Sequence, residues 1–202
     1  MRFADILTDW RGNPSTTRQI ALLERISAAL DASSDCTAAA VVGSFAKGTA
    51  DRVSDIDLVV FCADGAGNVL LHLIEQQITP SEIFLEFGGV HDPKSPYKKL
   101  IFEDLTSVEF HVIAPDTELI IEQPFVEIVN HDHYLESRMS SNIAPTEHDM
   151  TAYRYGDRLL AWELFTCLKW LWRGDFKAVK RYLVDLGRAI KASEETDGSA
   201  VG

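Results

Sequence analysis

The sequence contains no apolar run long enough to span a lipid bilayer, and it lacks the pattern of a signal peptide. Cysteine is scarce: there are three, Cys36, Cys62 and Cys167, and their spacing is not that of metal ligands. An odd, small number of cysteines fits reduced thiols better than a disulfide-stabilised scaffold. We therefore expect a cytoplasmic protein with reduced thiols and no association with membranes.

Basic residues are also few, with 19 Lys and Arg against 31 Asp and Glu and a net charge of −12. Because a nucleic-acid-binding protein neutralises phosphates with Lys and Arg, this balance argues against a nucleic-acid partner. An acidic surface would favour the approach of a cationic small-molecule acceptor. The same charge can serve solubility alone, and composition by itself favours that simpler interpretation.

The 202 residues, 46% of them hydrophobic, are enough for one large domain or two small ones. Apolar periodicity and turn residues predict helices and strands in alternation up to about residue 130, followed by two long helices. The helices are expected at 15–33, 44–47, 69–78, 116–123, 151–172 and 175–190, and the strands at 37–42, 56–62, 82–87, 100–102, 108–113 and 125–129.

This pattern predicts an α+β fold in which a mixed β-sheet flanked by helices is followed by an α-helical lobe. We assign residues 1–140 to the first domain and residues 141–192 to the helical lobe, with the boundary in a polar stretch around Pro145. Residues 193–202 are small and polar and are predicted to be disordered.

The most informative segment starts where the strand 37–42 ends, at Gly43 and Ser44. A Gly-Ser turn that leaves a strand presents backbone N–H groups to phosphate oxygens, so we expect nucleotide binding here. Gly43 would let a phosphate approach the backbone, and Ser44 would contact its oxygens. Lys47 either touches phosphate or lies on the helix surface, and the sequence leaves both open.

Asp55 and Asp57 follow, two residues apart at the start of a strand, so both side chains point to one face. Two carboxylates beside a phosphate-binding turn predict a divalent-metal site, with Mg²⁺ as the ion. Glu109 is the candidate third carboxylate and general base, although alone it could simply face solvent on an edge strand. His111, on the same face as Glu109, could assist the site or be structural.

These motifs together resemble the nucleotidyltransferase superfamily of DNA polymerase β. The resemblance rests on Gly43-Ser44, on Ser54 to Asp57, and on Glu109 in a later strand. The segments 100–111 and 162–176 look similar to the lincosamide nucleotidyltransferases within that superfamily. The resemblance implies a nucleotidyltransferase domain with a C-terminal helical domain, and it implies Asp55, Asp57 and Glu109 as metal ligands.

The activity implied is Mg²⁺-dependent transfer of AMP from ATP to a hydroxyl of a small molecule, with two metal ions and release of pyrophosphate. A lincosamide or aminoglycoside antibiotic is the expected acceptor, and a homodimer is compatible with the family. The helical part ends near residue 192, earlier than in lincosamide enzymes, which leaves the acceptor open. The alternatives are an antitoxin-type enzyme that adenylylates a partner protein and, less favoured because all three carboxylates are present, a non-catalytic nucleotide-binding module.

Overall fold

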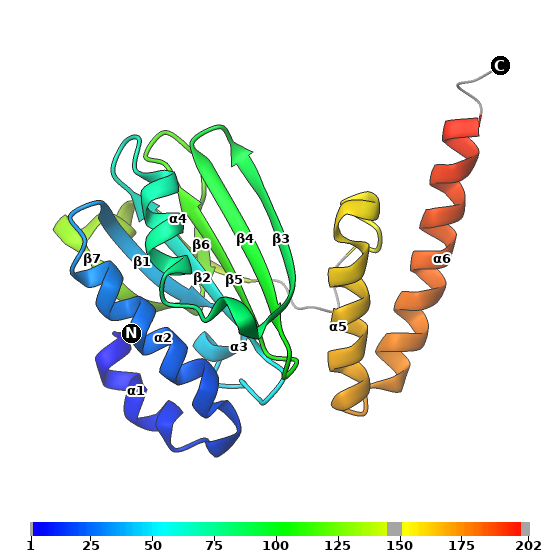
Figure 1. Ribbon diagram of the computed structural model, residues 1–202, viewed down its shortest axis with the longest axis horizontal. Helices are drawn as coiled ribbons and strands as arrows, with labels where there is room; N and C mark the ends of the chain where they lie inside the picture. The colour runs from blue at the N-terminus through cyan, green and yellow to red at the C-terminus, as the bar shows by residue number, and fades with distance from the viewer. Residues whose placement is uncertain (1, 145–150, 199–202) are drawn as a thin grey trace. The chain divides into compact units, whose positions relative to one another are not determined.

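A computed structural model describes residues 2–144 and 151–198 of the protein (Figure 1). These residues form two compact units that divide between Ala144 and Pro145. The sequence-based assignment of one domain to each stays a prediction.

The first unit contains a six-stranded mixed sheet with the strand order β3-β4-β5-β2-β1-β7. The β2–β5 pair is parallel, and the other neighbours in this sheet are antiparallel. A small parallel sheet of β6 and β8 lies outside it. The helices are α1 (Phe3–Arg11), α2 (Thr17–Asp31), α3 (Gly43–Ala46) and α4 (Gly67–Glu75), and the strands are β1 (Cys36–Val42), β2 (Asp55–Cys62), β3 (Ile83–Asp92), β4 (Ser95–Phe102), β5 (Ser107–Ile113), β6 (Ile121–Gln123), β7 (Val126–Asn130) and β8 (Met139–Ile143).

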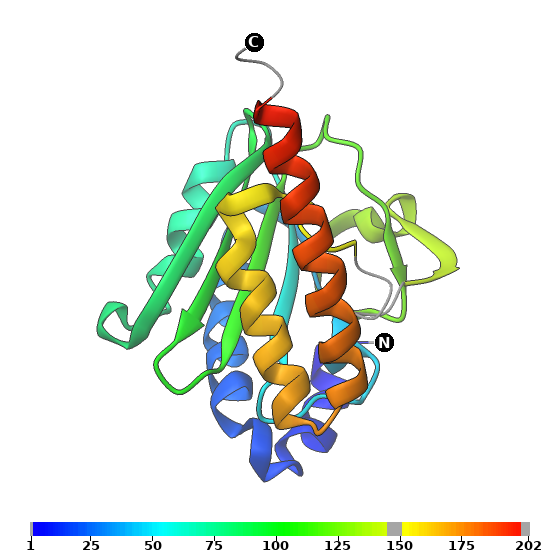
Figure 2. The same ribbon diagram turned by 90° about the vertical axis from the view of Figure 1, so that its right-hand side faces the viewer.

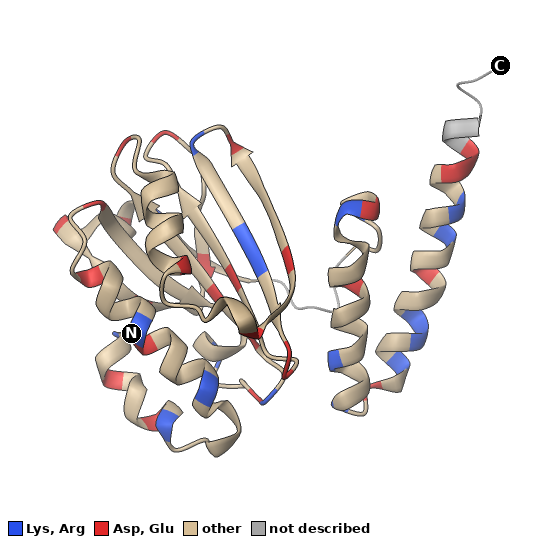
Figure 3. Cartoon of the chain, viewed as in Figure 1, with Lys and Arg blue, Asp and Glu red and all other residues tan. Residues whose placement is uncertain are grey.

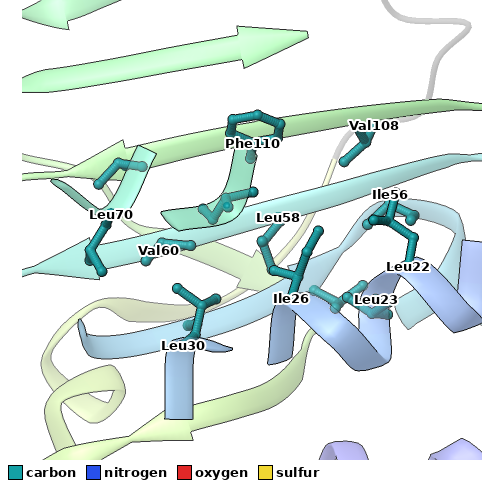
Figure 4. Packing of buried hydrophobic residues seen from close by; sticks show 14 of the residues in the cluster. Leu22, Leu23, Ile26, Leu30, Ile56, Leu58, Val60, Leu70, Val108 and Phe110 are labelled. Carbon is teal, nitrogen blue, oxygen red and sulfur yellow. The ribbon is translucent and has the colours of Figure 1, made fainter. Parts of the chain in front are cut away.

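Helices α2 and α4 cover one face of the large sheet, where the main hydrophobic core lies (Figure 4). Alternate residues of β2, namely Ile56, Leu58 and Val60, point into this core. Leu23 and Ile26 of α2 meet them at helical spacing, and both are fully buried. Each such side chain contributes about 1.5–3 kcal/mol through burial, so this face anchors β2 against the helices.

The other face of β2 carries Asp55 and Asp57 at its start and buried apolar residues further along. Phe61 packs there against Leu135 and Tyr134 of the 3₁₀ segment η3 (His131–Ser137). Arg138 fixes this segment by donating to the Thr117 carbonyl at 2.7 Å and to the Tyr134 hydroxyl at 2.7 Å. The first three residues of β2, which include Asp55 and Asp57, are thus the polar end of an otherwise buried strand.

The second unit is a helical hairpin of α5 (Leu160–Trp172) and α6 (Phe176–Gly198), which run side by side (Figure 2). Gly174, at φ +78°, makes the turn between them. Buried Glu163 accepts hydrogen bonds from the Tyr153 N–H at 2.8 Å and from the Tyr182 hydroxyl at 3.0 Å. A carboxylate therefore ties the start of α5 to the middle of α6.

All three cysteines are buried and free. Cys36 and Cys62 stand opposite each other on β1 and β2, and Cys167 lies on α5. Burial raises the pKa of each thiol, and burial together with the neighbouring Cys62 raises that of Cys36 to about 12. These thiols are packing residues in their protonated form.

The predicted α+β class is confirmed, but several elements differ from expectation. The helix predicted at 116–123 is wrong: Asp116 pairs with Lys94 at 2.8 Å instead of capping a helix, and the short strand β6 follows. Strand β4 is longer than the expected 100–102, and α5 begins at Leu160 rather than at 151. Helix α1 was not predicted from the sequence.

The segment 193–202, predicted to be disordered, continues α6 as far as Gly198. Extending an existing helix adds one hydrogen bond per residue fixed, so a polar composition alone does not stop it. Residues 199–202 lie outside the described residues. Within the described ranges, no helix combines the length and the apolar character needed to cross a membrane.

Candidate active site

A tight turn follows β1 at the start of the predicted phosphate-binding residues. Gly43 has φ +67°, and the Lys47 N–H donates to its carbonyl at 3.1 Å. A Cβ at position 43 would lie 2.0 Å from Asp57 Oδ2. Glycine is therefore required by the left-handed backbone and by the close approach of a carboxylate, a reason that the sequence did not suggest.

Of the other two predicted nucleotide-binding residues, Ser44 lies on the short helix α3 and Lys47 directly follows its end. Ser44 is half-buried and Lys47 is exposed. Their positions beside the Gly43 turn are compatible with contacts to phosphate, and those contacts stay predictions.

The turn that leads into β2 is held by a buried amide side chain. Gln19 of α2, 3% exposed, donates through Nε2 to the carbonyls of Arg52 at 2.9 Å and Asp51 at 3.4 Å. Buried carbonyls need such partners, because an unpaired one is costly. Gln19 thereby fixes the backbone immediately before Asp55.

The structure brings Asp55, Asp57 and Glu109 to one face of the sheet. Strands β2 and β5 run parallel with Asp57 opposite Glu109 and Asp55 opposite Ser107. Residues directly opposed on neighbouring strands point to the same side, as do residues two apart on one strand. The Ser107 hydroxyl donates to Asp55 Oδ1. Figure 3 shows acidic positions and a basic stretch on the neighbouring strands of this sheet.

Glu109 is held by two neighbours through the same oxygen, Oε1. Lys99 Nζ of β4 forms an ion pair with it, and His111 Nε2 lies 2.7 Å away. Burial opposes the charged form, but the His111 hydrogen bond and the Lys99 charge outweigh burial and lower the Glu109 pKa from 4.5 to about 2. Glu109 is therefore ionised at neutral pH and is a weak base.

His111 continues this chain to His91 of β3. His91 Nε2 lies 2.6 Å from His111 Nδ1 and the two rings stack; Tyr97 stacks on His111 and lies tilted against His91. An ionised carboxylate only accepts, so His111 Nε2 donates to Glu109, and the direction of the bond between His91 and His111 depends on the tautomers of the two rings. Burial and the nearby His111 lower the pKa of His91. The sequence left open whether His111 assists the site or is structural, and the geometry places it in contact with the site residue Glu109.

The donor set fits Mg²⁺ at the aspartate pair. Mg²⁺ takes one or two carboxylates and completes its shell with waters and phosphate oxygens, and Asp55 and Asp57 offer two carboxylates beside the Gly43 turn. Glu109 fits less well, because Lys99 and His111 already engage it. Within residues 2–144 and 151–198, no three His, Cys, Asp or Glu side chains lie close enough together to hold an ion. Ligation by Glu109 stays a prediction.

Three side chains around these carboxylates belong to none of the motifs seen in the sequence, namely Gln19, His91 and Lys99, and a fourth, Ser107, lies in the segment 100–111 but was given no role. Ser107 and Lys99 had a usable signal. Ser107 is two residues before Glu109 on β5, so alternation places both on one face. Lys99 stands opposite Glu109 once β4 is extended to begin before residue 100. Gln19 and His91 come from segments distant in sequence, and their contacts depend on the tertiary fold.

Comparison with known proteins defines the class. The profile of the nucleotidyltransferase domain family matches residues 23–135, more than half of the chain, so the protein belongs to this family. The predicted enzyme class, a nucleotidyltransferase, is thereby confirmed. The specific likeness to lincosamide enzymes stays a prediction. No curated protein matches the chain.

Two solved structures are similar over part of their length. One is a cytoplasmic RNA terminal U-transferase, with 23% identity and a TM-score of 0.34 over 48% of this chain and 30% of that one. The other is the Cid1 poly(U) polymerase, solved with Mg and 3′-dATP, with 23% identity and a TM-score of 0.34 over 50% of this chain and 31% of that one. This chain spans less than a third of either enzyme.

Proposed function

We propose that this protein transfers AMP from Mg-ATP to a hydroxyl group of a small molecule and releases pyrophosphate. Family membership supports the reaction class. The observation that carries the proposal is the approach of Asp57 Oδ2 to Gly43, so close that no Cβ would fit between them. The carboxylate that would hold the ion of a Mg-nucleotide lies against the turn that would receive its phosphates.

Asp55 and Asp57 would hold Mg²⁺, which neutralises charge on the triphosphate when bound. Ser44 and the backbone at Gly43 would bind phosphate oxygens, with Lys47 next to them. The acceptor oxygen forms a bond to the α-phosphorus while the bond from that phosphorus to the pyrophosphate oxygen breaks. The hydroxyl proton passes to Glu109.

Glu109 is ionised and can accept this proton, but its pKa of about 2 makes it a weak base. General acid–base catalysis typically contributes about 10²–10⁴-fold when the pKa lies near the operating pH. The contribution of Glu109 is therefore at the low end of this range. The aspartate pair, which positions the nucleotide, contributes more.

A cationic antibiotic of the lincosamide or aminoglycoside class is the acceptor that we propose. The net charge of −12 supports a cationic acceptor, because an acidic surface raises its local concentration. The resemblance of residues 100–111 and 162–176 to lincosamide enzymes supports the antibiotic class.

Purified protein with Mg-ATP and a panel of these antibiotics should release pyrophosphate and yield an antibiotic heavier by AMP. Asp57→Asn should lower turnover by about 10³-fold, the scale expected when an electrostatic contact at the reacting phosphate is lost. Glu109→Gln should lower it less. Asp64→Asn, on an exposed side chain just after β2, is the matched control and should leave turnover unchanged.

Unchanged turnover in Asp57→Asn would refute the assigned site. ATP binding without turnover across the whole panel would remove the antibiotic acceptors and keep the transferase. Labelled AMP that appears on a co-expressed protein and on no small molecule would replace the small-molecule acceptor with a protein.

A further inference from the structure

Three charged side chains form one row across the sheet. Lys99 of β4 stands opposite Glu109 of β5, which stands opposite Asp57 of β2. All three point to the face of the candidate site, because opposed residues on neighbouring strands share a face. Glu109 therefore stands between the backbone positions of Lys99 and Asp57, and its Oε1 is paired with the Lys99 ammonium.

The Lys99–Glu109 pair is well enclosed. Lys99 and Glu109 side chains are 11% and 19% exposed, and Lys99 Nζ contacts the same carboxylate oxygen as His111 Nε2. Charges removed from water need a partner of opposite sign, and each of these satisfies the other. A divalent ion that bound this oxygen would lie beside the ammonium and repel it.

The neighbouring lysine shows that the arrangement is particular to position 99. Lys98 directly precedes Lys99 on β4 and points to the opposite face, where it pairs with Glu75 and Glu86. Both lysines are ion-paired and mostly enclosed, but Lys99 alone of the two shares a carboxylate with the candidate site. This makes Lys98 a matched reference for any effect of removing a charge from β4.

We propose that Lys99 takes the place of a second metal ion at Glu109, so that the site binds one divalent ion with each nucleotide. The inference rests on the proposed nucleotide-binding function and departs from the two ions that the sequence suggested. Asp55 and Asp57 serve the single ion. Lys99 is a positioning residue that holds Glu109 by charge.

Native mass spectrometry can count ions and nucleotides on the same chain, with Mn²⁺ as the ion and α,β-methylene-ATP as the non-reacting nucleotide. The wild-type chain should carry one analogue and one Mn²⁺. Lys99→Met keeps the apolar stem but removes the charge, so Glu109 should recruit a second Mn²⁺ beside Asp57. Lys99→Arg and Lys98→Met should each carry one. The double variant Lys99→Met with Glu109→Gln should return to one, which excludes a structural effect of the lysine change.

Two Mn²⁺ ions on the wild-type chain with the analogue, or one on folded Lys99→Met, would overturn the inference and leave the proposed function intact. A wild-type chain that binds no analogue would overturn the proposed function and the inference together. Circular dichroism of each variant establishes that it is folded, and if Lys99→Met does not fold, Lys99→Gln replaces it with the same expected count of two.

Discussion

Replacing Gly43 with alanine perturbs the contact on which the candidate site depends. The added Cβ would lie 2.0 Å from Asp57 Oδ2, whereas real Cβ contacts essentially never fall below 3.0 Å, so the carboxylate has to shift by about 1 Å. Alanine at φ +67° is strained as well. The substitution therefore acts on stability and on the site through separate causes.

The two effects have different magnitudes. A residue with a Cβ in the left-handed region costs about 1–2 kcal/mol, which sets the expected loss of unfolding free energy. Displacing a positioning group by about 1 Å can cost about 100-fold in rate, so the rate of pyrophosphate release should fall by about that factor. Urea denaturation measures the first effect, and initial rates with Mg-ATP and an acceptor measure the second.

Gly48 supplies the matched control. Its φ of +69° is nearly that of Gly43, but an added Cβ would meet nothing within 4 Å. Gly48→Ala should lose the same about 1–2 kcal/mol of stability and keep its rate of pyrophosphate release. Equal rates in the two variants would show that the approach of Asp57 to Gly43 has no part in the activity.

Three further predictions follow from single contacts. Gln19→Leu leaves backbone carbonyls before Asp55 without this partner, so urea denaturation should show a loss of about 1–3 kcal/mol of unfolding free energy. The affinity for Mg-ATP should fall as well, and a variant in which both values are unchanged would contradict the prediction. The lowered Glu109 pKa, about 2 against 4.5, adds stability above pH 4.5 that is lost as pH falls towards 2. Between pH 5 and pH 3, the unfolding free energy of the wild type should therefore fall by about 2 kcal/mol relative to that of Glu109→Gln. A difference that stays constant over this range would refute the pairing. Tyr182→Phe removes the donor to buried Glu163 and should cost about 1.5–3 kcal/mol in thermal unfolding, whereas no loss would mean that the bond is unimportant.

The sequence was sufficient where local pattern decides the outcome. Asp55 and Asp57 share a face because strand alternation is a local property, and the apolar run after them identified the strand. The Gly43 turn was visible for the same reason. The position of Glu109 opposite Asp57 needed the pairing of β2 with β5, which joins residues 52 apart in the chain.

The remainder depended on contacts that no local pattern encodes. The pairing of Asp116 with Lys94 competes with a helix cap, and sequence alone does not show which partner Asp116 takes. Strand β4 includes Pro96 and two lysines, which weakened its apolar signal, although pairing with β3 and β5 extends it to Ser95. The role of Lys99 was hidden because its strand was placed too short.

The three enclosed thiols make the unmodified chain its own unfolding probe. The thiolate is the form that attacks a thiol reagent, and burial with a raised pKa keeps Cys36, Cys62 and Cys167 protonated and out of reach. Labelling therefore has to wait for local opening, at Cys36 and Cys62 for the central sheet and at Cys167 for the helical hairpin. Two labelling rates, resolved by peptide mapping, would time the opening of the two units independently and without an engineered reporter.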